Sequence, residues 1–271
     1  MGDLPVVGAQ LTVLDLDRHR DWLFEKNRDL ELPEFAMADI LRSPDVFVSM
    51  AREKLDGWDG RLGIHGPFSG FDLHTGDRDI QAIVQTRMAQ ALDVCDQLGA
   101  VQMVIHSPFD SWDRDNLDMR AKGRENRASA IVKTLKPALK RAEDQGVTLV
   151  LENIKDCDPR DRMLVIEAAD SPALRLSVDT GHANWAHHIQ GAPPADRFIA
   201  LAGDKLAHVH LQDTDGYADR HWHLGAGNIP WLAVMEAIAE TKANPHLIVE
   251  INDFDRVEES VKHLESLGLA Q

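Results

Sequence analysis

Short runs of β-forming residues alternate with longer amphipathic stretches from one end of this chain to the other. The runs in the middle of the chain are rich in Val, Ile and Leu, which is typical of parallel strands covered by helices. We predict eight strands, over residues 6–13, 30–35, 61–68, 101–108, 147–153, 174–181, 206–213 and 246–253. The clearest helical periodicity predicts helices over residues 80–98, 127–144, 229–241 and 257–267. Helices are expected to end at the glycine caps Gly99, Gly146 and Gly203.

Strand-then-helix units that follow one another with no proline- or serine-rich linker indicate one closed (β/α)8 barrel, the TIM-barrel architecture. The 271 residues fit this fold, whose usual size is roughly 250 residues. A doubly wound open sheet is the competing arrangement, but no glycine-rich phosphate loop follows the first predicted strand. We therefore predict an α/β chain with a single barrel domain over residues 1–271.

The net charge of −16 limits the partners that the chain can bind. Long-range repulsion disfavours nucleic acid, and no stretch of the sequence is rich in Lys and Arg. No apolar run approaches the roughly 20 residues of a membrane span, and the N-terminus lacks the basic and apolar regions of a signal peptide. With only two cysteines, a disulfide framework is not expected. These features favour a cytoplasmic protein that acts on a small molecule.

Residue types that bind metal ions stand at or just beyond the end of almost every later strand. Barrel enzymes place their chemistry at the C-terminal ends of the strands, and a closed barrel brings all of these ends to one mouth. We expect convergence there of nine side chains that lie far apart in the sequence: His65, His106, Glu152, Asp179, His182, His210, Asp219, His221 and Glu250.

The mixture of imidazoles and carboxylates suits ions such as Zn, Mn, Co or Fe, whereas carboxylates alone would indicate Mg or Ca. Carboxylates clustered without a cation would repel one another, and the strand ends supply no lysine cluster to balance them. A bound divalent metal ion (Mn, Zn or Co) is the simplest counter-charge. Taken alone, Glu152 or Glu250 could cap the following helix, so the prediction depends on the nine residues occurring together.

Other polar features do not follow this pattern. His208 shares a strand face with His210, and we expect it to have a buried structural role. The charged segment over residues 109–124 is interpreted as a long loop, either a lid or a plain solvated loop. Surface or local hydrogen-bonding positions are expected for the remaining histidines, which are His19, His74, His187, His188, His223, His246 and His263.

Seven short motifs surround the predicted metal ligands. They are HGPF at 65–68, VIHSP at 104–108, LEN at 151–153, VDTGH at 178–182, HVHLQD at 208–213, DRHWHLGAGNIPW at 219–231 and VEIND at 249–253. In composition and order they resemble the motifs of the xylose isomerase-like TIM barrel superfamily. That superfamily includes sugar isomerases and epimerases, inosose-processing enzymes and apurinic endonuclease IV. The resemblance extends over roughly residues 60–253, and the first two strand–helix units carry little of it.

The resemblance implies two alternative site arrangements. In the epimerases and related isomerases, residues matching Glu152, Asp179, His210 and Glu250 hold one metal ion, and the two glutamates transfer protons on opposite faces of the sugar. In the endonuclease IV-like arrangement, three zinc ions are held by residues matching the whole set, which adds His65, His106, His182, Asp219 and His221. The epimerase pattern also places a substrate-binding arginine soon after the strand-seven histidine. Here Arg220 follows His210 by ten positions, so that role is not carried over.

Two enzymatic functions therefore remain open. The first is a divalent-metal-dependent isomerase or epimerase that acts on a small sugar or sugar derivative by enediolate proton transfer, with Glu152 and Glu250 as the proton-transfer residues. The alternative is an endonuclease IV-like hydrolase with two or three zinc ions, acting on a phosphoester or a related small substrate. A non-catalytic binding barrel is disfavoured by the complete ligand set. Relatives in this superfamily often dimerise or tetramerise, which leaves a homo-oligomer open.

Overall fold

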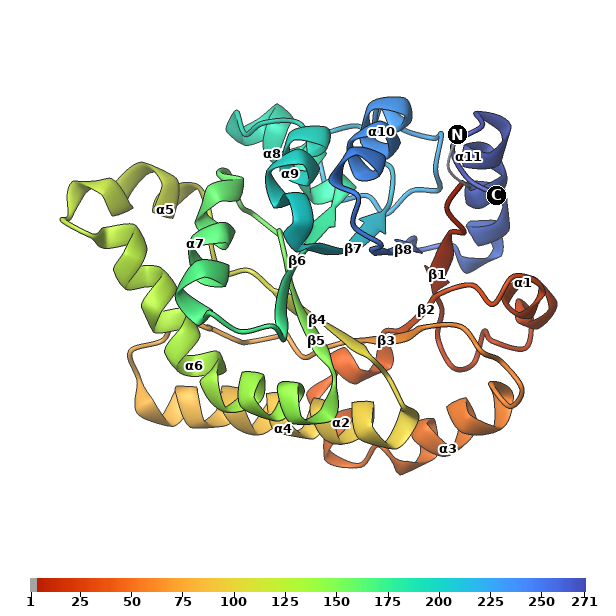
Figure 1. Ribbon diagram of the computed structural model, residues 1–271, viewed down its shortest axis with the longest axis horizontal. Coiled ribbons are helices and arrows are strands. Elements are labelled where there is room, and N and C mark those ends of the chain that lie inside the picture. Colours follow the sequence, from red (N-terminus) through yellow and green to blue (C-terminus); the bar gives the residue numbers. More distant parts are fainter. Residues whose placement is uncertain (1–3) are drawn as a thin grey trace.

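The computed structural model describes residues 4–271 and closes eight parallel strands into a barrel (Figure 1). Neighbouring strands pair in chain order, and the last strand returns to pair with the first. The strands are β1 (Gly8–Gln10), β2 (Leu30–Leu32), β3 (Leu62–His65), β4 (Gln102–His106), β5 (Thr148–Glu152), β6 (Leu174–Asp179), β7 (Leu206–Leu211) and β8 (His246–Val249). The predicted (β/α)8 barrel is confirmed. Each predicted strand contains the observed one but is longer, because the chain leaves the hydrogen-bonded ladder where it bends into the loops.

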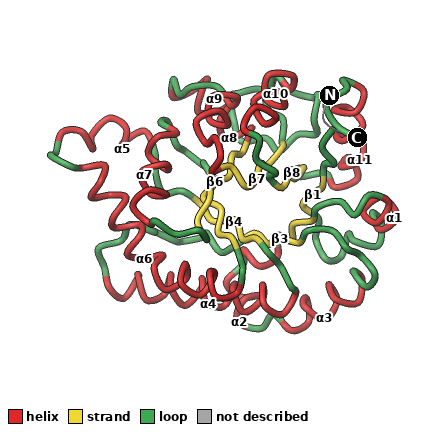
Figure 2. Tube along the Cα trace, in the orientation of Figure 1, coloured by secondary structure: helices red, strands yellow, loops and turns green. Residues whose placement is uncertain are grey.

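The helices form a ring outside the strands, as Figure 2 shows in red around yellow. The main helices are α1 (Arg20–Glu25), α2 (Ala38–Arg42), α3 (Asp45–Lys54), α4 (Arg78–Leu98), α5 (Ser111–Asn116), α6 (Gly123–Gln145), α7 (Pro159–Ala169), α8 (Thr180–Gln190), α9 (Ala195–Ala202), α10 (Trp231–Thr241) and α11 (Val257–Ser266). Short 3-10 turns are η1 (Glu34–Ala36), η2 (Leu117–Met119), η3 (Gly203–Lys205) and η4 (Phe254–Arg256). The four predicted helices correspond to α4, α6, α10 and α11.

Local capping explains where the long helices begin and end. The Asp77 carboxylate accepts hydrogen bonds from the backbone N–H groups of Asp79 and Ile80, so α4 begins two residues earlier than its periodicity predicts. Gly99 and Gly146 end α4 and α6 in the left-handed conformation, with φ of 69° and 72°. Gly203 ends α9, also with positive φ. The three predicted glycine caps are confirmed.

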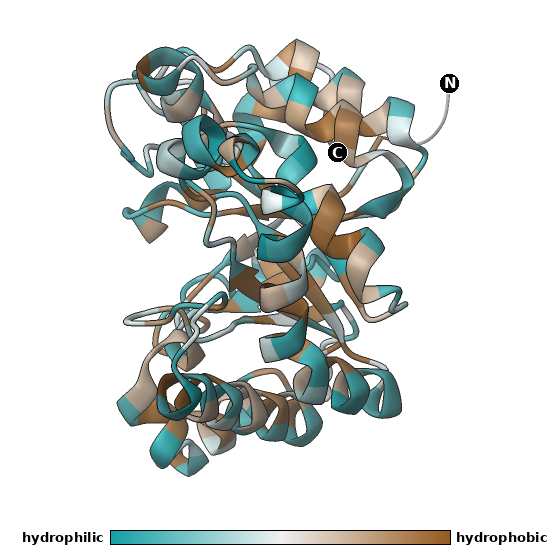
Figure 3. Cartoon of the chain, turned by 90° about the vertical axis from the view of Figure 1, so that its left-hand side faces the viewer, coloured by the Kyte–Doolittle hydropathy of each residue, from teal (hydrophilic) through white to brown (hydrophobic). Residues whose placement is uncertain are grey.

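The core lies between the strands and the helices that cover them. Strand residues such as Ile105, Leu149 and Val209 are fully buried, and so are helix residues such as Leu92 and Leu135. Figure 3, with hydrophobic residues in brown, shows the strands at the centre mostly brown and many teal residues on the outer helix turns. Because all eight strands are parallel, their carboxyl ends open at one mouth of the barrel.

Three local predictions are wrong. The segment over residues 109–124 is largely helical, because Asp110 caps α5 through the Asp113 N–H and the Arg124 guanidinium pairs with buried Asp161. His19 is buried against the ring of Trp22 instead of lying at the surface. His246 is also buried, because it begins β8.

Both cysteines, Cys95 and Cys157, are free and buried. Within residues 4–271, no helix combines the length and the apolar character that crossing a membrane requires. The backbone N–H of Gln271 donates to the carbonyl of Pro5, so the two ends of the described chain meet beside α11 (Figure 1).

Gly8 on β1 is a position where only glycine fits. A Cβ there would lie 1.9 Å from the carbonyl oxygen of Asp29, which accepts a hydrogen bond from Ala9 and is therefore held by the sheet. We expect Gly8→Ala to lower the free energy of unfolding by about 1–3 kcal/mol, because the backbone of the neighbouring strand must move. Gly63→Ala is the matched control, since its nearest neighbour would be 3.6 Å away. Equal unfolding midpoints for the two variants in denaturant would refute this prediction.

Candidate metal centre

The nine predicted ligands lie at the carboxyl ends of the strands or in the segments that follow them, and they form three clusters. The central cluster is Glu152, Asp179, His210 and Glu250; the β3–β4 cluster is His65, His106 and Glu152; and the loop cluster is His182, Asp219 and His221. In each cluster one potential ligand atom per residue lies within 4.8 Å of every other. Glu152 belongs to two clusters, so the β3–β4 and central clusters share a carboxylate. The convergence predicted from the sequence is therefore present in the fold.

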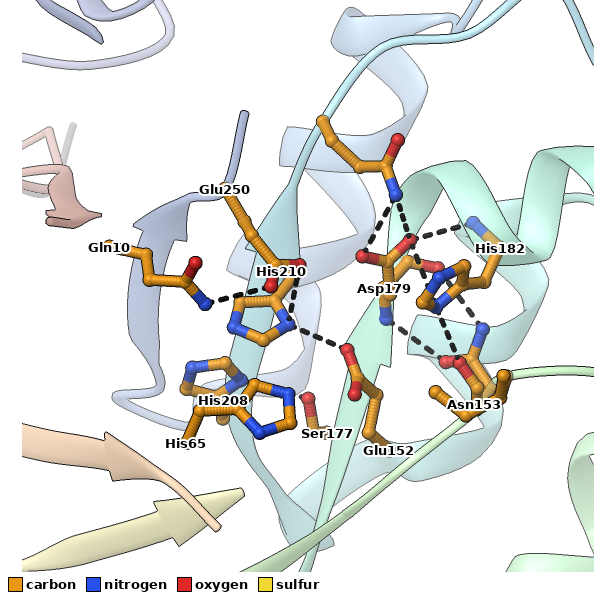
Figure 4. Close-up of polar contacts among 12 residues, drawn as sticks. Gln10, His65, Glu152, Asn153, Ser177, Asp179, His182, His208, His210 and Glu250 are labelled. Carbon is orange, nitrogen blue, oxygen red and sulfur yellow. Dashed lines mark hydrogen bonds and ion pairs between the residues drawn. The ribbon is translucent and has the colours of Figure 1, made fainter. Parts of the chain in front are cut away.

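The central cluster is organised around one nitrogen atom. His210 Nδ1 lies 2.6 Å from Glu152 Oε1 and 3.2 Å from Glu250 Oε2. Figure 4 shows Glu152 and Glu250 directed toward the His210 ring, with Asp179 on the neighbouring strand. Asp179 also caps α8, because its carboxylate accepts the backbone N–H of His182 at 2.6 Å. Glu152, Asp179 and His210 are at most 1% exposed, whereas the Glu250 side chain keeps 12% exposure toward the mouth.

In the β3–β4 cluster, two imidazoles lie beside the Glu152 carboxylate. His65 donates its Nδ1–H to the carbonyl of Gly66, so Nε2 is the nitrogen that faces the cluster. His106 Nε2 lies 3.2 Å from His65 Nε2 and 3.4 Å from Glu152 Oε2. Burial lowers the pKa of His106 to about 3, so its imidazole is neutral at pH 7. The ring of Phe68 stacks on His106 with centroids 4.1 Å apart and fixes its plane.

The loop cluster uses the same arrangement of imidazoles. His182 donates Nδ1–H to the carbonyl of Asn153, and His221 donates Nδ1–H to the carbonyl of Glu250. Their Nε2 atoms lie 3.3 and 3.1 Å from the two oxygens of Asp219. His221 has a φ of 48°, an uncommon conformation for a non-glycine residue. Backbone acceptors at Nδ1 orient histidine ligands in many metal sites, because they leave Nε2 to bind the ion.

The carboxylates of the mouth strongly influence one another. Burial raises the pKa of Asp179 to about 6, and the nearby carboxylates of Glu152 and Glu250 act in the same direction. Burial also acts to raise the pKa of Glu152, but His210 and the surrounding imidazoles outweigh it and hold that pKa well below its usual range. Glu152 is therefore an ionised carboxylate at neutral pH, with Oε1 paired to His210 and Oε2 available as a ligand or as a base.

The donor set fits a divalent ion. Glu152 Oε2 is buried and has no hydrogen-bond partner in the described structure, which is costly unless a cation or another group binds it. Within residues 4–271, the ion pairs of the clustered acids are with histidines, and no lysine or arginine lies within ion-pair distance of them. Imidazole nitrogens together with carboxylate oxygens are the donors that Zn, Mn and Co accept.

Binding of an ion should release protons. Burial acts to lower the pKa of His210, but three neighbouring carboxylates outweigh it and raise that pKa well above its ordinary value. They belong to Glu250, Glu31 and Glu152. Burial also acts to lower the pKa of His221, but Asp219 and the other nearby carboxylates raise that pKa to about 9. Both imidazoles are thus protonated at pH 7, and an ion must displace a proton from each that it binds.

We therefore expect the affinity of the central cluster for Co²⁺ to rise as the pH increases above 7 and His210 loses its proton, with release of at least one proton per ion bound. Calorimetric titration at pH 7 in two buffers of different ionisation enthalpy measures this number. Identical heats in the two buffers would contradict the prediction.

The sequence prediction missed four polar residues that support these clusters. Glu31 lies on β2 and contacts His210, and Gln10 lies on β1 and donates to Glu250. The side-chain amide of Gln212 donates to Asp179 and Asp219, and its oxygen Oε1 accepts the backbone N–H of His221. Asn153 donates to the carbonyl of Asp179. An acid between two leucines at the start of a predicted strand is the signal that could have drawn attention to Glu31. The predicted burial of His208 is confirmed at 1% exposure.

A cavity of about 240 Å³ opens beside the β3–β4 cluster. His106 forms part of its wall, and Phe68, Phe109, Lys155 and Asp110 contribute apolar and charged surface. The cavity thus places aromatic and charged groups beside one of the predicted ligands, where they could contact a bound molecule.

The fold and the site define a class of protein, the (β/α)8 barrels that carry imidazole and carboxylate clusters at the mouth. Comparison with known sequences shows to which family of these barrels the chain belongs. A sequence model of the xylose isomerase-like TIM barrel family matches residues 28–267, and the chain belongs to this family. The resemblance inferred from the motifs is thereby confirmed. The match begins before β2, so it also covers a part of the chain where no motif was recognised.

Individual relatives are more distant. An uncharacterised protein of Methanocaldococcus jannaschii is 25% identical over 200 residues, which cover 69% of this chain and 63% of that protein. Fructoselysine 3-epimerase of Escherichia coli O157:H7 is 30% identical over 116 residues, which cover 41% of this chain and 40% of the epimerase. The matched part of this chain thus spans less than two thirds of the length of these curated relatives.

Solved structures match over almost the whole chain. A D-tagatose 3-epimerase-like protein superposes with a TM-score of 0.78 at 21% identity, covering 96% of each chain. The TTHB071 protein of Thermus thermophilus, in a crystal soaked with ZnCl2, gives a TM-score of 0.75 at 25% identity and covers 98% of this chain and 99% of that chain. Relatives and structural neighbours therefore include sugar epimerases of the same superfamily.

Proposed function

We propose that this chain is a divalent-metal-dependent enzyme that isomerises or epimerises a small sugar or sugar derivative. The observation that carries the proposal is the central cluster, in which two glutamates approach the same histidine nitrogen beside Asp179. The identity to fructoselysine 3-epimerase and the fold shared with other sugar epimerases support it. The negative charge of the chain does not hinder a neutral sugar from binding.

The proton-transfer roles belong to Glu152 and Glu250. A divalent ion in the central cluster would supply Lewis-acid stabilisation of adjacent carbonyl and hydroxyl oxygens of the sugar. One glutamate removes the proton from the carbon beside the carbonyl, and the other returns a proton to the enediolate on the opposite face. His182 and His221 orient substrate hydroxyls from the loop cluster. The Glu250 side chain is 12% exposed, so it is the more accessible of the two glutamates to a substrate.

Exchange of substrate hydrogen with solvent tests the proposal. The protein is incubated with Mn, Co or Zn and a panel of ketoses and their derivatives in D2O, and NMR follows deuterium at the carbon beside the carbonyl. We expect metal-dependent deuterium incorporation together with formation of the epimer or isomer. Absence of exchange across the panel, together with metal-dependent cleavage of a nitrophenyl phosphodiester, would contradict the proposal.

The hydrolase is a second candidate, and one specific observation favours it. The β3–β4 and loop clusters place further imidazole and carboxylate donors beside the central cluster, so the mouth has donors for more than one ion. Several ions could generate hydroxide near neutral pH and stabilise a leaving oxygen. Elemental analysis of protein purified without chelator separates the two candidates. About one ion per chain favours the isomerase or epimerase, and about three zinc ions favour the hydrolase.

A further inference from the structure

Below the mouth, the interior of the barrel contains a buried carboxylate that the proposed reaction does not use. Glu31 projects from β2, is 1% exposed and lies between Leu30 and Leu32. Its Oε1 lies 3.0 Å from His210 Nε2, and its Oε2 lies 3.2 Å from His208 Nε2. A carboxylate inside a barrel is costly to bury unless it is paired and hydrogen-bonded, so these contacts must compensate for lost hydration.

Gln10 joins this buried acid to the central cluster. Its Nε2 donates to Glu31 Oε1 at 2.9 Å and to Glu250 Oε1 at 2.7 Å. Both neighbours are carboxylates that only accept when ionised, so the amide nitrogen, and not the amide oxygen, must face them. Figure 4 shows the amide of Gln10 extending from β1 toward Glu250. With Oε1 held in this way, the other oxygen of Glu250 is directed toward His210 Nδ1.

The two nitrogens of His210 consequently have different partners. Nδ1 faces Glu152 and Glu250, whereas the acid that Nε2 faces is Glu31. A carboxylate acceptor at Nε2 keeps a proton on that nitrogen, and the lone pair of Nδ1 becomes available once its own proton leaves. Histidine ligands of metal ions commonly donate their second N–H to a carboxylate in this way, which fixes the ring and makes the ligating nitrogen more basic.

We propose that Glu31 and Gln10 are positioning residues of the metal centre. Glu31 selects the His210 tautomer that binds an ion through Nδ1. Gln10 fixes the positions of the Glu31 and Glu250 carboxylates relative to each other. Ser177 extends the arrangement, because its hydroxyl lies 2.8 Å from His208 Nδ1 and orients the imidazole against which Glu31 Oε2 lies. The proposal rests on the proposed ion in the central cluster.

Replacement of Glu31 by glutamine tests the positioning role, with Co²⁺ as the probe ion. Glu31→Gln keeps the size of the side chain and replaces an ionised acceptor with a neutral amide. We expect about 10- to 100-fold weaker Co²⁺ affinity, measured by competition with a chelating dye, and an altered visible spectrum of the bound Co²⁺. A change in protein stability alone would not alter that spectrum, because it reports the ligands and their geometry.

Glu34→Gln is the matched control. Glu34 lies three positions further along, and its carboxylate accepts the backbone N–H of Val13 instead of contacting the central cluster. We expect it to bind Co²⁺ with the affinity and the spectrum of the unmodified protein. Gln10→Met removes the amide donor at similar size, and we expect roughly tenfold weaker affinity.

The outcomes distinguish failure of the positioning role from failure of the proposed metal-dependent function. If the unmodified protein binds no Co²⁺, the proposed metal-dependent function fails. If it binds Co²⁺ and Glu31→Gln binds equally well with the same spectrum, the positioning role is overturned. Should Glu31→Gln not fold, Gln10→Met decides: reduced affinity supports the proposal, and unchanged affinity with an unchanged spectrum overturns it.

Discussion

Glu250→Gln is expected to reduce sugar turnover by about 100- to 10,000-fold, the usual contribution of a positioned acid–base group, when it is assayed at an ion concentration that saturates the variant. The amide oxygen can remain near His210 Nδ1, where Glu250 Oε2 lies at 3.2 Å, but an amide cannot accept and return a proton. The measurements are kcat for the substrate identified by deuterium exchange and metal content per chain.

Glu240→Gln is the control for this experiment, because the same change is made at an exposed position on α10, remote from the mouth. It should leave both kcat and metal content unchanged. A metal-loaded Glu250→Gln protein that retains the turnover of the unmodified protein would exclude Glu250 as a proton-transfer residue, and with it the mechanism proposed above.

Removal of the metal should destabilise the protein substantially. Without an ion, Glu152, Asp179 and Glu250 are crowded together in the central cluster, and the raised pKa of Asp179 reflects both burial and this crowding. An ion at a concentration about 1,000-fold above its Kd stabilises the folded state by about 4 kcal/mol. For a chain of this size we expect a rise in Tm of roughly 8 °C or more when Mn, Co or Zn is returned to chelator-treated protein.

Asp179→Asn provides the comparison for the Tm measurement. The amide can still cap α8 through the backbone N–H of His182, so the helix keeps a partner. The metal-induced rise in Tm should nevertheless be much smaller, because a charged ligand is lost. A Tm that does not respond to any of the three ions in the unmodified protein would show that the central cluster is not a metal site.

The fold was predictable because its signal is spread over the whole chain. Each strand–helix unit repeats the same alternation of β-forming and amphipathic residues, and a wrong boundary in one unit does not change the topology. Short elements escaped prediction, since α5 has only six residues and its formation depends on the Asp110 cap and on contacts of the following segment. Helical periodicity cannot be recognised over so short a stretch.

The outline of the site was also predictable, because strand ends converge wherever a barrel closes. The supporting residues were not. Gln10 and Glu31 lie on β1 and β2, where no motif marks them, and their importance arises from partners that are distant in the sequence, such as Glu250. His19 and His246 were assigned wrongly for a related reason, since burial of a single histidine depends on the elements packed around it.

Anomalous X-ray diffraction at the cobalt absorption edge, from crystals grown with Co²⁺, tests the proposed cation site directly. An anomalous peak about 2.0–2.2 Å from oxygen atoms of Glu152, Asp179 and Glu250 and from Nδ1 of His210 is the expected result. If these four side chains diverge and cobalt binds elsewhere or not at all, the proposed metal site is wrong.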